Sequence, residues 1–179
     1  MSVLALVAAC SEAPQGLLNS TILRGDVAAI EKLLDDPRVD VNWHTPKTGS
    51  ALGVAAAYAQ PNQGAIVRLL LRRGANPNIA TDENMTPLHS AAYHGYADIV
   101  KVLIDAGAEV NTAESRYGFT PLAYAARSGS VEVIKLLIDA GADRAIQVEN
   151  GRTPIAVAGQ YGNLEAVNTL TFYQPTRRE

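Results

Sequence analysis

A segment of about 33 residues recurs five times between residues 14 and 173 of this 179-residue chain. The clearest copy begins at Thr86-Pro87-Leu88, and a Thr-Pro start returns at Thr120 and Thr153, with spacings of 34 and 33 residues. Upstream, residues 50–52 and 16–18 occupy the equivalent places. Because one copy is too short to bury its own apolar face, the copies must stack on one another. The repeat therefore predicts a solenoid that is stabilised by interfaces between neighbouring units.

Each copy carries signals for two short helices. In the third copy, Thr86 can cap a helix N-terminus and Pro87 suits the first helical position. Gly95 ends this helix after about two turns, since glycine readily adopts the left-handed conformation found just after helices. An apolar stripe over residues 99–104 then marks a second helix, which ends at Gly107. Each unit is therefore predicted to be an antiparallel helix pair.

The head of the third copy, Thr-Pro-Leu-His-Ser-Ala at residues 86–91, resembles that of ankyrin repeats, and a period near 33 is typical of them. The resemblance covers residues 14–173. It implies an all-α solenoid of stacked helix pairs with β-hairpin fingers, which binds partners along a concave surface. We expect the five repeats to span residues 14–49, 50–85, 86–119, 120–152 and 153–173, of which the first and the last are caps. An apolar segment at 1–13 precedes them, and a tail at 174–179 follows them.

Three places depart from the family pattern. Trp43 and Lys47 put bulk into the first finger, where the tryptophan either packs on the neighbouring finger or is an exposed anchor for a partner. The stretch 58–64 is longer than its counterpart in the third repeat and contains Pro and Gly, so we expect a bulging loop between two helices. The second helix of the fifth repeat presents Asn163 and Asn168, and a terminal repeat needs such a polar outer face.

Asn42 and Asn111 end two matching stretches, 34–42 and 103–111. These stretches resemble segments that are hydroxylated on asparagine in animal ankyrin proteins. The alternative interpretation, which we favour, is that both amides bond backbone groups, as an asparagine at this position of the finger normally does.

Composition excludes several classes of protein. A net charge of −3 and a pI near 5.6 argue against a nucleic-acid-binding protein, which would carry clustered Lys and Arg. No apolar run approaches the roughly 18 residues that a membrane-spanning helix needs. With one cysteine, the chain can form neither an internal disulfide nor a zinc site built on several thiolates. We therefore expect no nucleic-acid partner and no metal.

The apolar stretch Val3–Cys10 has two interpretations. It is either an extra helix that covers the first repeat, or the remnant of a signal, because Val7-Ala8-Ala9-Cys10 is similar to the lipobox of bacterial lipoproteins. The stretch lacks a basic region and is short for a signal, which speaks against the second interpretation. We expect a cytoplasmic protein, and a periplasmic or outer-membrane lipoprotein only if Cys10 is lipidated.

Catalytic patterns are missing from the sequence. His89 occupies the family's Thr-Pro-Leu-His position, where we expect it to tie neighbouring turns together. His44 and His94 lie more than one repeat apart and so cannot share a metal without further ligands. No glycine-rich phosphate loop occurs, and no nucleophile has a base and an orienting acid at spacings that the repeat would bring together. We expect neither a cofactor nor an enzymatic activity.

The resemblance assigns partner binding to the finger tips and to the two residues before each mid-repeat glycine. In this chain those positions are rich in Tyr, Arg, Phe and Met, which carry binding energy when a partner buries them. The predicted partner-binding residues are Trp43, Lys47, Tyr58, Asp82, Glu83, Met85, Tyr93, His94, Arg116, Tyr117, Phe119, Arg127, Glu149, Arg152 and Tyr161. Among them we expect Tyr117, Phe119 and Arg127 to be exposed, central anchors.

The sequence thus predicts a non-enzymatic, monomeric module that binds another protein through its concave face. The alternative is an envelope ankyrin lipoprotein, tethered through Cys10, that sequesters an envelope partner or acts as an immunity or antitoxin-like factor.

Overall fold

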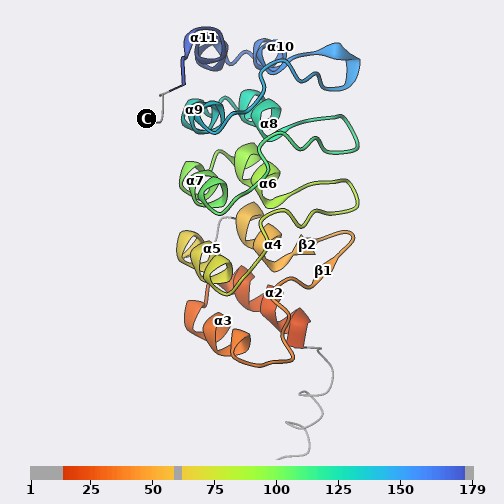
Figure 1. Ribbon diagram of the computed structural model, residues 1–179, viewed down its shortest axis with the longest axis vertical. Helices are drawn as coiled ribbons and strands as arrows, with labels where there is room; N and C mark the ends of the chain where they lie inside the picture. Colours follow the sequence, from red (N-terminus) through yellow and green to blue (C-terminus); the bar gives the residue numbers. More distant parts are fainter. Residues whose placement is uncertain (1–13, 59–61, 176–179) are drawn as a thin grey trace, which may run out of the picture.

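The computed structural model describes residues 14–58 and 62–175 and shows one elongated stack of helix pairs (Figure 1). The first helix of each pair lies in the middle of the stack, the second lies on one side, and the loops between pairs project to the other side. The pairs are α2 (Pro14–Arg24) with α3 (Val27–Leu34), α4 (Ala51–Ala57) with α5 (Gln63–Arg72), α6 (Pro87–His94) with α7 (Ala97–Asp105), α8 (Pro121–Ser128) with α9 (Val131–Asp139), and α10 (Pro154–Gln160) with α11 (Leu164–Phe172). The predicted all-α solenoid is confirmed.

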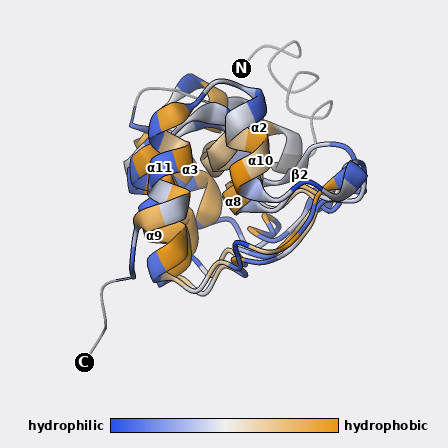
Figure 2. Cartoon of the chain, turned by 90° about the horizontal axis from the view of Figure 1, so that it is seen from above, coloured by the Kyte–Doolittle hydropathy of each residue, from blue (hydrophilic) through white to orange (hydrophobic). Residues whose placement is uncertain are grey.

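The loops between pairs form the fingers, which overlie one another when the stack is seen from above (Figure 2). The first finger contains the two-residue strands β1 (His44–Thr45) and β2 (Gly49–Ser50), which pair antiparallel. The last finger has one bridge, Val148 with Arg152, beside the short 3₁₀ helix η1 (Glu149–Gly151). The fingers between them have no paired strands among the described residues and are closed by backbone hydrogen bonds, which include those from Thr81 N to Met85 O and from Glu114 N to Phe119 O. The predicted hairpins are therefore present in a minimal form.

The central helices, which we call the inner helices, begin and end where the sequence signals predict. Thr86 and Thr120 precede prolines at the first positions of α6 and α8, and Gly95 and Gly129 end these helices in the left-handed conformation. At Gly129 a Cβ atom would lie 2.9 Å from the side chain of Asn163, which belongs to the next repeat. Glycine is needed there for close approach as well as for its backbone angles.

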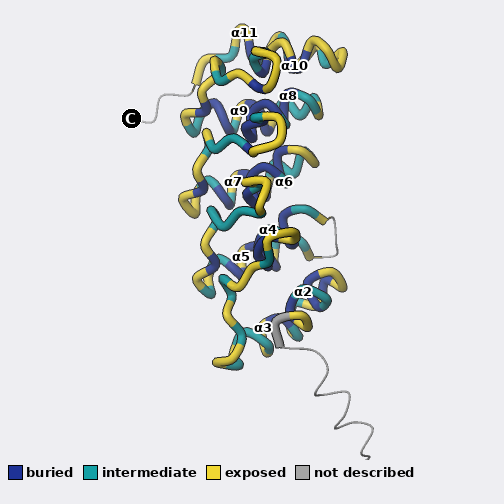
Figure 3. The backbone as a smooth tube through the Cα atoms, turned by 90° about the vertical axis from the view of Figure 1, so that its right-hand side faces the viewer, coloured by how far each residue is buried: buried dark blue, intermediate teal, exposed yellow. Residues whose placement is uncertain are grey.

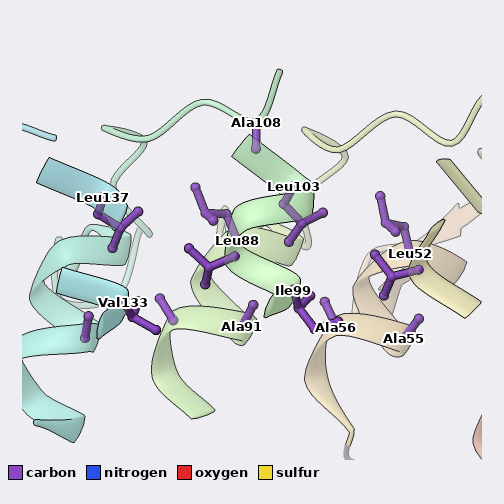
Figure 4. Close-up of a cluster of buried hydrophobic side chains, with 14 of the residues drawn as sticks. Leu52, Ala55, Ala56, Leu88, Ala91, Ile99, Leu103, Ala108, Val133 and Leu137 are labelled. Atoms are coloured by element: carbon purple, nitrogen blue, oxygen red, sulfur yellow. The ribbon is translucent and has the colours of Figure 1, made fainter. Parts of the chain in front are cut away.

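Buried residues lie along the helices from one end of the stack to the other (Figure 3). The core that they form is a row of apolar side chains, part of which Figure 4 shows. Leu52, Leu88 and Leu122 occupy the same place in three repeats and are fully buried. Small alanines such as Ala55 and Ala91 lie beside them and allow the inner helices to approach closely. Each pair thus buries its apolar face against its neighbours, as predicted.

Three asparagines connect the first four repeats, one at each junction. We call the second helix of each pair its outer helix. The side-chain amide of each asparagine donates to a carbonyl just after the outer helix of the next repeat and accepts from the backbone N–H two residues further on. The bonds join Asn42 to Gly74 O and Asn76 N, Asn78 to Gly107 O and Glu109 N, and Asn111 to Gly141 O and Asp143 N, with lengths between 2.7 and 3.2 Å. Asn42 and Asn111 therefore bond backbone groups, as the favoured interpretation required, but across repeats.

His89 joins the start of α6 to the finger that follows it. Its Nδ1 accepts from the backbone N–H of Thr86 (3.1 Å), and its Nε2 donates to the carbonyl of Thr112 (2.9 Å). The ring is fully buried, and this burial lowers the pKa of His89 to about 4. The histidine is therefore neutral near pH 7 and has the structural contacts that we expected.

Two local predictions were wrong. Gly64 is part of α5, not of the loop before it, because α5 already begins at Gln63. Asn163 does not face outward from the fifth repeat. Its amide donates to the carbonyls of Ala126 and Arg127 (3.0 and 2.8 Å) and so joins the start of α11 to α8. Cys10, with the rest of segment 1–13, lies outside the described residues.

Leu103→Ala tests whether stability comes from these interfaces. The Leu103 side chain is fully buried in α7, so we expect the free energy of unfolding to fall by about 2 to 5 kcal/mol through lost burial and a residual cavity. Urea denaturation measures this change. Lys101→Ala, on the exposed side of the same helix, is the control and should change it by less than about 0.5 kcal/mol. Equal effects of the two substitutions would contradict the interface.

His89 should make stability depend on pH. The unfolded chain takes up a proton near the ordinary pKa of 6.5, whereas the folded chain does so only near pH 4. Between these values the unfolded state binds more protons, so the free energy of unfolding should fall as pH drops, by at most about 1.4 kcal/mol per pH unit.

Urea titrations between pH 7 and pH 5 measure this dependence. In His89→Gln the protein should be less stable at pH 7 and should lose less of its remaining stability on acidification. His94→Gln, at an exposed position, is the matched control and should follow the unmodified protein. Parallel curves for His89→Gln and the unmodified protein would show that His89 does not cause the effect.

Candidate functional site: the groove between fingers and inner helices

The angle between the fingers and the inner helices is hollowed in the N-terminal half of the stack. A pocket of about 390 Å³ lies there, between α2, α4, α6 and the first two fingers. Leu23 and Tyr58 line it from the inner helices, and Lys47, Glu83 and Met85 line it from the fingers. The structure therefore brings together four of the predicted residues, since all of these except Leu23 were predicted.

Leu23 was missed by the sequence analysis, although a signal for it exists. It occupies the repeat position of Tyr93 and Arg127, two residues before the mid-repeat glycine. The first helix of repeat one lacks the Thr-Pro start that marks the equivalent positions in repeats three to five. Its side chain is half exposed at the wall of the pocket.

In the C-terminal half, aromatic rings flank one arginine on the same inner-helix surface. The guanidinium carbon of Arg127, at the end of α8, lies 5.6 Å from the ring centre of Tyr93 and 5.1 Å from that of Tyr161. The two tyrosines come from the repeats before and after it. At these distances a guanidinium is attracted to each ring face. These three predicted residues thus form one row across three repeats, which we call the Tyr–Arg–Tyr row.

Tyr124 packs against this row and was not among the predicted residues. It lies one helical turn before Arg127 on the same face of α8, a spacing that could have identified it. Its ring packs edge-on to Tyr93, with centres 5.6 Å apart, and against Phe119 at 4.9 Å. Burial raises the pKa of Tyr124 to about 12, with the nearby Glu114 carboxylate adding to the shift. The hydroxyl therefore stays protonated and can donate a hydrogen bond.

Phe119 is a correction to the predicted site. Its side chain is only 6% exposed and forms a small cluster with Ala123, Val148 and Val157. The residue before Thr120 points into the space between two repeats, where the next finger covers it. Phe119 is therefore a packing residue and not an exposed anchor, whereas Tyr117, two residues earlier, is 47% exposed.

Neighbouring fingers are linked near their tips. The Glu83 carboxylate pairs with Arg116 at 2.8 Å, and the Arg116 guanidinium lies 5.9 Å from the Tyr117 ring centre. Backbone hydrogen bonds run from one finger to the next, from Asp82 N to Pro46 O, from Ser115 N to Glu83 O and from Glu149 N to Tyr117 O, with lengths between 2.6 and 2.8 Å. Asp82 and Glu149 present exposed side chains at these tips. The finger tips are therefore connected into one edge.

Glu114 fixes the shape of the finger before α8. Its buried carboxylate accepts hydrogen bonds from the backbone N–H groups of Arg116, Tyr117 and Phe119, at 2.6, 2.8 and 3.1 Å. This role of Glu114 was not predicted, although an acid just before a glycine-containing turn is a sequence signal for it.

The remaining predicted residues lie around these features. His94 stacks on Tyr96 with ring centres 5.3 Å apart and meets Tyr93 edge-on at 5.0 Å. Trp43 is 41% exposed beside the first finger and does not line the groove pocket. Arg152 is partly buried, and its Nε has no hydrogen-bond partner among the residues that the structure describes.

Within residues 14–58 and 62–175, no group of three or more His, Cys, Asp or Glu side chains is placed to hold a metal ion. None of the helices in these ranges combines the length and the apolar character that crossing a membrane requires. The groove combines aromatic and aliphatic side chains with a few charged ones, among them Lys47, Glu83 and the Arg127 guanidinium, and this mixture is suited to non-covalent recognition.

Comparison with known proteins identifies the family. The model for ankyrin repeats in three copies matches residues 18–114 and 112–177. The chain is 26% identical over 156 residues to palmitoyltransferase AKR1 of Lachancea kluyveri, which covers 84% of this chain and 21% of that protein. It is 32% identical over 87 residues to ankyrin repeat protein YahD of Escherichia coli, with 48% of this chain and 43% of that protein covered.

A third relative, ankyrin repeat domain-containing protein 49 of Bos taurus, is 44% identical over 46 residues, which is 26% of this chain and 19% of that protein. The chain spans less than half the length of each of these relatives, so the palmitoyltransferase name describes only that protein. The family match covers nearly all of the described stack. The chain therefore belongs to the ankyrin-repeat family.

Proposed function

We propose that this protein binds another protein through the groove between its fingers and inner helices. The observation that carries the proposal is a line of exposed, mostly aromatic side chains at the ends of four inner helices. They are Leu23, Tyr58, Tyr93 and Tyr161, each between 42 and 57% exposed. Stacking does not need these side chains, since the interfaces use Leu88 and its equivalents on another face of the helices.

Burial of these side chains would contribute much of the binding energy. A tyrosine that is fully covered removes about 150 to 250 Å² of surface from water, and such residues are frequent hot spots. The pocket at Leu23 and Tyr58 has the concave shape that an inserted side chain requires. Ankyrin repeats are generally protein-interaction modules and typically non-enzymatic, so we propose no catalytic activity for this chain.

We also propose that the protein is a cytoplasmic monomer, with lipidation of Cys10 as the alternative. Intact-mass spectrometry of the protein made in its own cells separates the two. An N-terminal cysteine that carries acyl chains would require the envelope interpretation, whereas an unmodified N-terminus that includes residues 1–9 would exclude it.

The groove is tested by Leu23→Ser with Tyr58→Ala, after a partner has been captured from the protein's own cells and identified. We expect the double variant to bind that partner about a hundredfold more weakly, which corresponds to roughly 3 kcal/mol. Calorimetric titration measures the affinity. Because both side chains lie away from the stacking face, the melting temperature should change little.

The matched control is Lys32→Ala with Lys101→Ala, at exposed positions on the outer helices α3 and α7. Its affinity should equal that of the unmodified protein. Loss of binding in the control alone, or equal loss in both double variants, would place the interface outside the groove.

A further inference from the structure

We infer that the C-terminal half of the groove is a receptor for a carboxylate, so that the partner segment lying over repeats three to five is acidic. An Asp or Glu side chain of that segment pairs with Arg127 in the Tyr–Arg–Tyr row. This inference rests on the proposed function and specifies its partner.

Two aromatic rings hold the Arg127 guanidinium in place, but no carboxylate of the described residues pairs with it. The rings of Tyr93 and Tyr161 flank its guanidinium at 5.6 and 5.1 Å, and the side chain is half-buried. Among residues 14–58 and 62–175, no carboxylate forms an ion pair with Arg127, and no group accepts a hydrogen bond from its guanidinium. Its N–H donors are therefore available to a ligand.

The nearby acids are already engaged or lie out of range. Glu83 pairs with Arg116 at 2.8 Å, and the carboxylate of Glu114 accepts three backbone N–H groups. Asp82 and Glu149, exposed at the finger tips, form no ion pair with Arg127. No carboxylate of the described residues therefore lies within ion-pair distance of the Arg127 guanidinium.

The geometry favours a carboxylate within a partly apolar segment. Arginine presents a planar fork of N–H donors that matches a carboxylate with two parallel hydrogen bonds. The flanking rings restrict the guanidinium before binding, which reduces the entropy lost on pairing. They also offer apolar walls to the residues beside the acid.

A phage-display library of short random peptides tests the inference before any natural partner has been identified. Peptides are selected on the full-length protein and on Arg127→Glu. We expect peptides from the unmodified protein to share an Asp or Glu at a fixed position next to apolar residues, and Arg127→Glu to select Lys or Arg there. If the peptides selected on the Arg127→Glu protein carry the same acid at that position, the proposal is wrong.

A double-mutant cycle with the most enriched peptide gives the quantitative test. Arg127→Gln, and replacement of the peptide acid by its amide, should each weaken binding at least tenfold, and the two together should weaken it little further. Circular dichroism checks that Arg127→Gln remains folded. Arg68→Gln, at an exposed position on α5, is the matched control and should leave the affinity unchanged. Additive losses in the cycle would overturn the pairing.

The same peptides distinguish failure of this inference from failure of the proposed function. Peptides that lose affinity for Leu23→Ser with Tyr58→Ala but show no preference for acids would refute only the carboxylate receptor. If the peptides bind the Leu23→Ser, Tyr58→Ala double variant and the Arg127→Gln variant as tightly as they bind the unmodified protein, both the groove and the carboxylate receptor are refuted.

Discussion

The packing of one helix pair on the next is the interaction on which this structure depends. The described pairs share most of their core, because Leu52, Leu88 and their equivalents belong to one buried cluster that runs from the first pair to the last. Asn42, Asn78 and Asn111 bond across the same junctions and so fix the spacing and the relative rotation of the repeats. Leu23, Tyr58 and Tyr93, at the ends of the inner helices, are not part of this core and stand exposed.

Local signals explain why the helices could be predicted closely. The third repeat shows this, because Pro87 at the start and Gly95 just after the end bound α6 as the sequence predicts. Gly64 was misplaced because glycine and proline usually indicate a loop, whereas the helix here starts one residue earlier and tolerates the glycine. The hairpin fingers came from the family resemblance, and only the first of the described fingers forms paired strands.

The site was predictable as a set of repeat positions, but not as a set of contacts. Equivalence between repeats correctly placed Tyr58 at the groove and Tyr93 on the inner-helix surface. It could not show that Phe119 is covered, because the cover comes from Val148 in the next finger. It could not pair Arg127 with rings from two other repeats either. Such contacts depend on how far the repeats are rotated and spaced, and a single repeat's sequence does not encode that.

The Tyr–Arg–Tyr row has a mechanical consequence. Its three members come from consecutive repeats, so the distances of 5.6 and 5.1 Å depend directly on the curvature of the solenoid. Any bending that spreads the inner helices separates the rings from the guanidinium and loosens the arginine. A partner that needs the arginine held in place therefore resists such bending. We expect occupancy of the groove and stiffness of the stack to rise together.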